Sequence, residues 1–162
     1  MTRTLILMRH AKSSWDSPGQ RDHARPLNAR GRRSAKAMGD WLREVGQVPD
    51  QILCSSAART RETCALLGFD VAADFMDALY HAEPDAMLQA LRGATGERVL
   101  MIGHNPGIAE LAQDLVTAPP AHPRFFDYPT CATLIVTFDA QGWSGVTRGT
   151  VQDFMVPRDL LE

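Results

Sequence analysis

The side chains best suited to chemistry in this sequence are two arginines and two histidines, each of which follows an apolar run of strand length. They are Arg9, His10, Arg59 and His104. Apolar runs of four to eight residues are typical of buried strands, and open α/β sheets bind ligands at the carboxyl ends of their strands. If the three strands concerned are neighbours in a parallel sheet, the four side chains converge at one edge.

A group of this kind is suited to binding an anion. Two guanidinium groups form a fork for phosphate or carboxylate, and helices that begin near Ser56 and Asn105 would add backbone N–H donors and positive dipole ends. Taken singly, each of the four residues is most simply a solvated charge or a satisfied polar group. Their common position after strand-like runs favours a binding site instead.

The elements that would position these residues alternate along the chain. Strands are predicted over 4–8, 51–55, 98–102 and 131–138, with a strand or extended segment over 69–75, a hairpin turn at 139–142 and one or two short strands within 145–156. Helices are predicted over 29–45, 57–67, 85–92 and 108–116, with Asn28 and Ser55-Ser56 as caps and Gly46 and Gly68 as stops. This alternation indicates an α/β fold, a three-layer sandwich around a central, mostly parallel mixed sheet.

Length and composition exclude several classes of protein. The 162 residues suffice for one domain, 1–162. A net charge of −2 gives no reason to expect nucleic acid or an anionic membrane as partner, and the arginines at 30, 32 and 33 are expected to lie on the solvent face of a helix. Three cysteines without metal or redox spacing, and no secretory leader or membrane-length apolar run, predict a soluble cytoplasmic protein.

Three motifs in this order resemble those of one known family. Segment 7–11 resembles the Arg-His-Gly signature of the histidine phosphatase superfamily, which has the phosphoglycerate-mutase-like fold. Segment 55–63 is similar to the family's Ser–Arg–Ala–Thr–Thr element, and 99–106 to the element of its second histidine. The spacing, together with segments 9–15 and 25–31, resembles the SixA-like phosphohistidine phosphatase branch.

The resemblance implies a phosphatase mechanism that needs no metal and no cofactor. His10 would attack phosphorus as a neutral imidazole and form a phosphohistidine intermediate. Arg9, Arg59 and His104 would bind the phosphoryl group and stabilise its charge, and water would then release phosphate. Ala11 stands where much of the family has glycine, which predicts that this position needs no positive φ.

A general acid is needed if the leaving group is an alkoxide. Relatives place a carboxylate in the region of Glu83, so Glu83 is the predicted catalytic acid, although it could equally complement the N-terminus of the next helix. Asp16 and Asp22, in the first loop, are further candidates. If the leaving group is a histidine, the acid matters less because imidazole leaves more readily.

Three more residues are predicted to bind substrate. Lys12 and Ser13 follow the nucleophile directly, although Lys12 could equally be a solvated loop residue. Asn105 could donate its backbone N–H to phosphate, cap its helix, or do both. No role is predicted for His81, and His23 is expected at the surface.

The predicted function is hydrolysis of phosphohistidine on a protein, such as a phosphorelay domain. The chain has no large inserted cap region, which predicts an open site that admits a phosphorylated side chain, and a monomer. The alternatives are a small-molecule phosphomonoesterase of the same fold, a mutase that returns the phosphate to an organic acceptor, and a phosphate-sensing or protein-binding module with little turnover.

Overall fold

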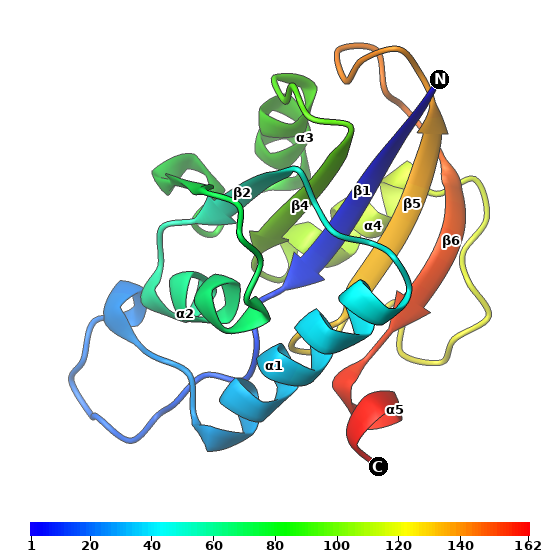
Figure 1. Ribbon diagram of the computed structural model, residues 1–162. Coiled ribbons are helices and arrows are strands. Elements are labelled where there is room, and N and C mark those ends of the chain that lie inside the picture. Colours follow the sequence, from blue (N-terminus) through cyan, green and yellow to red (C-terminus); the bar gives the residue numbers. More distant parts are fainter.

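The centre of the molecule is a six-stranded mixed sheet, shown in Figure 1 in the computed structural model, which describes residues 1–162. Its strands are β1 (Thr2–Arg9), β2 (Gln51–Ser55), β3 (Ala73–Met76), β4 (Arg98–Gly103), β5 (Thr133–Asp139) and β6 (Thr150–Met155). Their order is β3-β2-β4-β1-β5-β6, in which β3, β2, β4 and β1 are parallel, β5 is antiparallel to β1, and β6 is antiparallel to β5. The predicted mostly parallel mixed sheet is confirmed, and β2, β4 and β1 are neighbours.

Helices cover both faces of this sheet and make three layers (Figure 1). One face carries α3 (Pro84–Arg92) and α4 (Gly107–Leu115); the other carries α1 (Ala29–Glu44) and α2 (Ala58–Leu67), with α5 (Pro157–Leu161) against α1. Side chains of β1 alternate between the two cores: Leu5 and Leu7 pack with α3 and α4, and Ile6 and Met8 with α1 and α2. Because both faces are buried, β1 is apolar at consecutive positions. No helix has the length and apolar character needed to span a membrane.

Helix ends follow the local signals at three places. The Asn28 side chain accepts the Gly31 N–H at 2.8 Å and caps α1. Gly68 ends α2 with φ +78°, a conformation in which glycine has no steric cost. Pro84 occupies the first turn of α3, where its missing N–H is not needed.

The predicted cap of α2 is wrong. The N-cap residue is Ala57, and no side chain caps the helix. Both serine hydroxyls contact histidines instead: Ser55 Oγ lies 2.7 Å from His104 Nε2, and Ser56 Oγ lies 2.9 Å from His23 Nε2. These hydroxyls therefore belong to the polar end of the sheet rather than to the start of α2.

The C-terminal third differs most from the prediction. Strand β5 begins at Thr133, because Cys131 has φ +63° and cannot continue an extended strand. The predicted tight turn at 139–142 is instead a connection over residues 140–149, which buries Trp143 and lets its Nε1–H donate to the Gly96 carbonyl at 2.7 Å. One strand, β6, follows, and α5 was not predicted.

Candidate active site

A cavity of about 220 Å³ opens where β1, β2 and β4 end. It is lined by all of the residues predicted from the sequence except two candidate acids, Glu83 and Asp16: Arg9, His10, Lys12, Ser13, Arg59, His104 and Asn105. Trp15, Asp22, Arg25, His81 and Thr130 complete it. Glu83 is exposed and is not among the lining residues, and the carboxylate that lines the cavity belongs to Asp22. The chain has no group of three or more His, Cys, Asp or Glu side chains that could hold a metal ion.

His10 has the protonation that nucleophilic attack requires. Its Nδ1 lies 2.7 Å from the Ala11 carbonyl oxygen, which can only accept, so we assign the ring proton to Nδ1 and a free electron pair to Nε2. Burial, and after it the charges of Arg9 and Arg59, lowers the pKa of His10 to about 3, although the bond to Ala11 raises it. The ring is therefore neutral at physiological pH.

The segment after β1 is fixed by its backbone. The Ala11 N–H donates to Thr63 Oγ1 at 3.0 Å, and the Lys12 carbonyl accepts the Asn28 N–H at 3.0 Å. A Cβ at Gly31 would lie 2.1 Å from the Lys12 carbonyl oxygen, so only glycine lets α1 approach so closely. Ala11 has no positive φ, as its side chain predicts.

The two arginines carry unpaired donors into this region. Arg59, on α2, is 2% exposed, and the Nε atoms of Arg59 and Arg9 are buried without a hydrogen-bond partner. Burial, and then the neighbouring Arg59, lowers the pKa of Arg9. Buried unpaired donors cost free energy, and an anion bound between the guanidinium groups would remove that cost.

His104 supplies a third buried nitrogen without a partner. Ser55 Oγ accepts the Ala57 N–H at 3.4 Å and lies 2.7 Å from His104 Nε2. The other ring nitrogen of His104, Nδ1, is buried without a partner. Burial, and then the proximity of His10 and Arg59, lowers the pKa of His104 to about 2. The His10 and His104 ring centroids are 5.2 Å apart.

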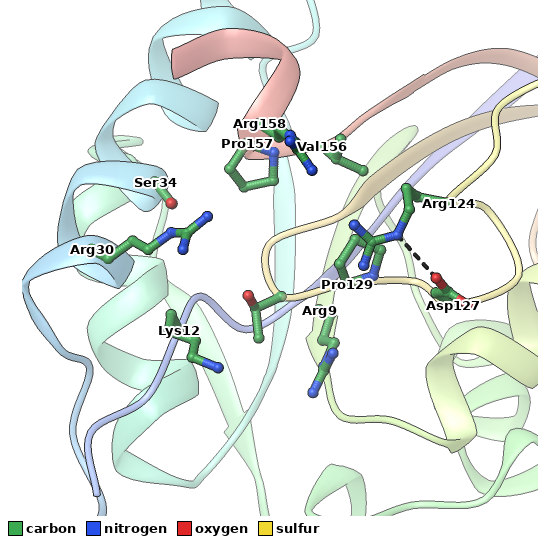
Figure 2. A pocket seen from close by; sticks show the side chains of 11 residues that line it. Arg9, Lys12, Arg30, Ser34, Arg124, Asp127, Pro129, Val156, Pro157 and Arg158 are labelled. Atoms are coloured by element: carbon green, nitrogen blue, oxygen red, sulfur yellow. Dashed lines mark hydrogen bonds and ion pairs between the residues drawn. The ribbon is translucent and has the colours of Figure 1, made fainter. Parts of the chain in front are cut away.

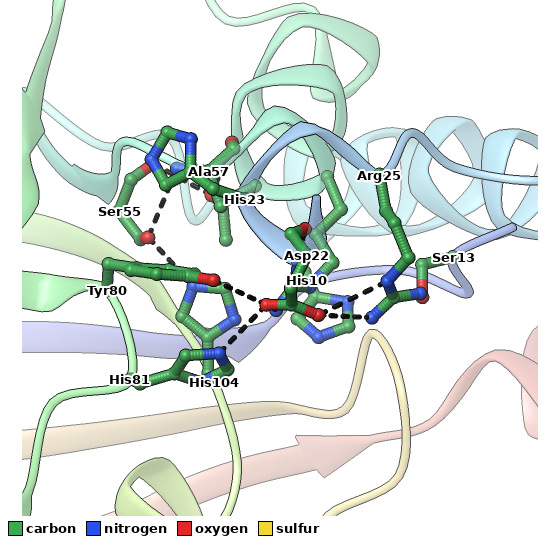
Figure 3. Close-up of polar contacts among 12 residues, drawn as sticks. His10, Ser13, Asp22, His23, Arg25, Ser55, Ala57, Tyr80, His81 and His104 are labelled. Carbon is green, nitrogen blue, oxygen red and sulfur yellow. Dashed lines mark hydrogen bonds and ion pairs between the residues drawn. The ribbon is translucent and has the colours of Figure 1, made fainter. Parts of the chain in front are cut away.

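Asp22 brings a negative charge into the cavity (Figure 3). It begins a 3₁₀ turn, Asp22–Ala24, in the first loop. Its Oδ2 accepts from Tyr80 Oη at 2.5 Å, His81 Nε2 at 2.9 Å and Arg59 at 3.1 Å, and its Oδ1 accepts from Arg25 at 3.0 Å. Partial burial raises the pKa of Asp22, but these four hydrogen bonds outweigh it and hold the pKa well below its usual range. The carboxylate is therefore ionised.

Nothing in the local sequence around Tyr80 and His81 predicts that these residues lie at the cavity. Tyr80 lies between His23, His81 and His104, with ring centroids 4.8, 4.2 and 5.5 Å away. They lie at the cavity because they bind Asp22 of the first loop, which is 58 and 59 residues away in the sequence. For the same reason the expectation that His23 is a surface residue misses its bond to Ser56.

Lys12, Ser13 and Asn105 have different surroundings. Ser13 Oγ accepts from Arg25 at 2.7 Å and so positions that guanidinium, whereas the Lys12 side chain makes no hydrogen bond. The Asn105 side-chain amide donates to two backbone carbonyls of the following loop, at 3.0 Å each. It does not cap α4, whose N-cap is Pro106 without a side-chain bond.

The sheet order and the polar edge formed by paired arginines and histidines define a phosphoglycerate-mutase-like α/β protein. The model of the histidine phosphatase superfamily (branch 1) matches residues 5–80. An uncharacterized protein of Mycobacterium tuberculosis is 35% identical over 160 residues, which cover 93% of this chain and 100% of the relative. The chain belongs to the histidine phosphatase superfamily, in its SixA-like branch.

Two solved structures support this assignment. The protein designated phosphohistidine phosphatase SixA from Nakamurella multipartitia is 30% identical, with a TM-score of 0.84 and 97% of both chains covered. The protein histidine phosphatase SixA complexed with tungstate is 25% identical, with a TM-score of 0.74, and the match covers 97% of this chain and 99% of that one. The similarity therefore extends over nearly the whole chain.

The two buried histidines make stability depend on pH. Their pKa values, about 3 and about 2 in the folded protein, lie below the 6.5 of an unfolded histidine. Below about pH 6.5 the unfolded chain binds more protons, so the free energy of unfolding falls as pH falls. Asp22, whose pKa is lowered from its ordinary value of 3.8, adds to this loss only below about pH 3.8. We expect a loss of about 3 kcal/mol between about pH 6.5 and about pH 5.

Urea unfolding at these two pH values measures this effect. The variant His104→Gln removes one of the two titrating groups and should reduce the loss by about half. A free energy of unfolding that is the same at both pH values contradicts the prediction.

Proposed function

We propose that this protein hydrolyses phosphohistidine on another protein through a covalent phosphohistidine at His10, without a metal ion. The observation that carries the proposal is the neutral His10 ring, with Nδ1 bonded and Nε2 free, in one cavity with Arg9, Arg59 and His104. Two similar proteins are designated phosphohistidine phosphatase SixA, and another was solved with tungstate.

The proposed reaction has two steps. His10 Nε2 attacks phosphorus, the new N–P bond forms, and the N–P bond to the substrate histidine breaks; that imidazole leaves and takes up a proton. Arg9, Arg59 and His104 stabilise the charge on the equatorial oxygens, which is the main task of a protein in phosphoryl transfer. Water then attacks the phosphohistidine, frees His10 and releases phosphate.

The rim of the cavity supports a protein substrate. Trp15 lines the cavity and is 73% exposed, and its ring stacks on Arg25 with 3.7 Å between the guanidinium carbon and the ring centroid. Tryptophan is enriched at protein contact surfaces, and the buried Arg25 supports the exposed Trp15 ring from below. The site can therefore contact the surface around a phosphorylated side chain as well as the phosphate.

A direct comparison of substrates tests the proposal. Wild-type protein is assayed in EDTA with a phosphohistidine-bearing protein and with p-nitrophenyl phosphate, and we expect a higher kcat/KM for the protein. If only p-nitrophenyl phosphate is hydrolysed, the protein is a phosphatase but the proposed protein substrate is wrong. Binding of orthophosphate without any turnover would favour a sensing module, and activity that EDTA removes would reject the metal-independent mechanism.

Asp22 favours a second candidate function, hydrolysis of small phosphomonoesters. An ester leaving group needs a proton, and a phosphate dianion bound beside Asp22 would raise the pKa of this carboxyl. Asp22 could then protonate the leaving oxygen. Glu83 remains the acid predicted from the sequence, and the two carboxylates can be separated by experiment.

We expect Asp22→Asn to lower kcat for an alkyl phosphate such as glycerol 3-phosphate by about 100-fold. The same change should lower kcat for p-nitrophenyl phosphate less than about tenfold, because nitrophenolate leaves without a proton. Glu83→Gln is the matched variant and should change neither rate. If Glu83→Gln lowers kcat for the alkyl phosphate alone and Asp22→Asn does not, the general acid is Glu83.

A further inference from the structure

A second cavity, of about 400 Å³, lies beside the catalytic cavity and shares Arg9, Lys12 and Thr130 with it (Figure 2). Five cationic side chains line it, and Asp127 is its one carboxylate. The cations are Arg9, Lys12, Arg30, Arg124 and Arg158. The whole chain carries a net charge of −2, so this concentration of positive charge is a local property of one concave surface. We call it the basic cavity.

The charges in the basic cavity are only partly neutralised. Arg124 pairs with Asp127 at 2.9 Å, and Arg158 pairs with Glu162 at 3.1 Å. Arg30 and Lys12 make no ion pair and no side-chain hydrogen bond, and the buried Arg9 Nε has no partner. Cations gathered on a concave surface raise the local concentration of anions. Arg30 is exposed on α1, as expected, and it also lines the basic cavity.

Tertiary structure brings these cations together from separate segments. Lys12 comes from the segment after β1, Arg30 from α1, Arg124 from the loop before β5, and Arg158 from α5. Figure 2 shows Arg30, Arg124 and Arg158 around the opening, with Arg9 and Lys12 on the side of the catalytic cavity. One lining residue, Val156, is hydrophobic, so the surface suits a charged group rather than an apolar one.

We propose that the basic cavity is a second anion subsite, which binds a phosphate or carboxylate that the substrate carries next to the phosphate placed at His10. Arg9 and Lys12 line both cavities, so a single ligand can reach from one to the other. The inference rests on the proposed function only in placing a phosphate in the catalytic cavity. The second anion is an acidic side chain beside a phosphohistidine, or a second phosphate on a small molecule.

Binding of two simple anions tests the subsite. The His10→Asn protein, which cannot form the phosphoenzyme, is titrated by calorimetry with orthophosphate and with tripolyphosphate at about 0.15 M salt. We expect tripolyphosphate to bind at least about tenfold more tightly, since it reaches additional charged donors. Adding Arg30→Gln and Arg158→Gln should remove this difference and leave the orthophosphate affinity unchanged.

A matched pair of substitutions controls for loss of charge. Lys36 and Arg148 are exposed and line neither of the two cavities. In the His10→Asn background, Lys36→Gln with Arg148→Gln removes the same charge as the test pair and should keep the preference for tripolyphosphate. Three results would overturn the proposal. The two anions could bind with equal affinity, the preference for tripolyphosphate could persist in Arg30→Gln with Arg158→Gln, or the control pair could lose the preference to the same extent. Because these titrations need no turnover, they decide the subsite even if the proposed function fails.

A second experiment identifies which kind of substrate supplies the second anion. Wild-type protein is assayed with phosphohistidine peptides that carry glutamates or glutamines beside the phosphohistidine. A kcat/KM about tenfold higher for the glutamate peptide, lost in Arg30→Gln with Arg158→Gln, supports the subsite and assigns it to an acidic protein segment. Equal rates for the two peptides, together with the tripolyphosphate preference, support the subsite and assign it to a second phosphate of a small molecule.

Discussion

Replacing His10 with asparagine is expected to lower kcat/KM by on the order of 10⁴-fold or more, with every phosphorylated substrate. The side-chain amide of asparagine can occupy the space of the ring, but it has no nitrogen with a free electron pair for attack on phosphorus. The loss should appear in kcat, because Arg9 and Arg59 still bind the phosphate. Steady-state rates measure the loss of kcat. Mass spectrometry of protein denatured in alkali detects the intermediate, and we expect a trapped phosphohistidine in wild type and none in the variant.

His122→Asn is the control for this substitution. His122 lies away from the cavity and pairs with Asp159 at 2.8 Å. Its replacement should leave both the rate and the trapped phosphoenzyme unchanged. A His10→Asn protein that turns over either substrate at the wild-type rate would show that another group is the nucleophile.

Replacing Arg59 with methionine is expected to lower kcat about 100- to 1000-fold. Arg59 is 2% exposed, and its unpaired Nε leaves it able to bind an equatorial oxygen of the transferred phosphoryl group. It also donates to the Asp22 backbone carbonyl at 2.8 Å and to the Asp22 carboxylate at 3.1 Å. Loss of these two bonds should release the first loop, so KM should rise together with the fall in kcat.

The matched control lies two positions further along α2. Arg61 is exposed and does not line the cavity; its Nε donates to the Ser56 carbonyl at 2.8 Å. Arg61→Met should retain activity within about threefold of wild type, whereas Arg59→Lys should recover part of the rate because it restores the charge without the planar fork. An Arg59→Met enzyme as active as Arg61→Met would exclude Arg59 from the reaction.

The sequence by itself determined the central strands and three site residues that follow their ends. The apolar run of β1 predicts a strand buried on both faces, and the same pattern identifies β4. Once the strands are parallel neighbours, Arg9, His10 and His104 must lie at one edge of the sheet, because side chains that follow strand ends have little freedom to lie elsewhere. Helix caps such as Asn28 are also local, since cap and partner are three residues apart.

Only the tertiary structure decided which carboxylate enters the cavity and which cations surround it. Asp22 lies in a long polar loop without hydrophobic periodicity, and its partners Tyr80 and His81 are 58 and 59 residues away in the sequence. Glu83 is placed by its own local sequence at the exposed start of α3, and Arg158 joins Arg30 at the basic cavity because α5 packs against α1. Periodicity reports whether an element is buried; which distant loops share one edge of a sheet depends on how the whole chain packs.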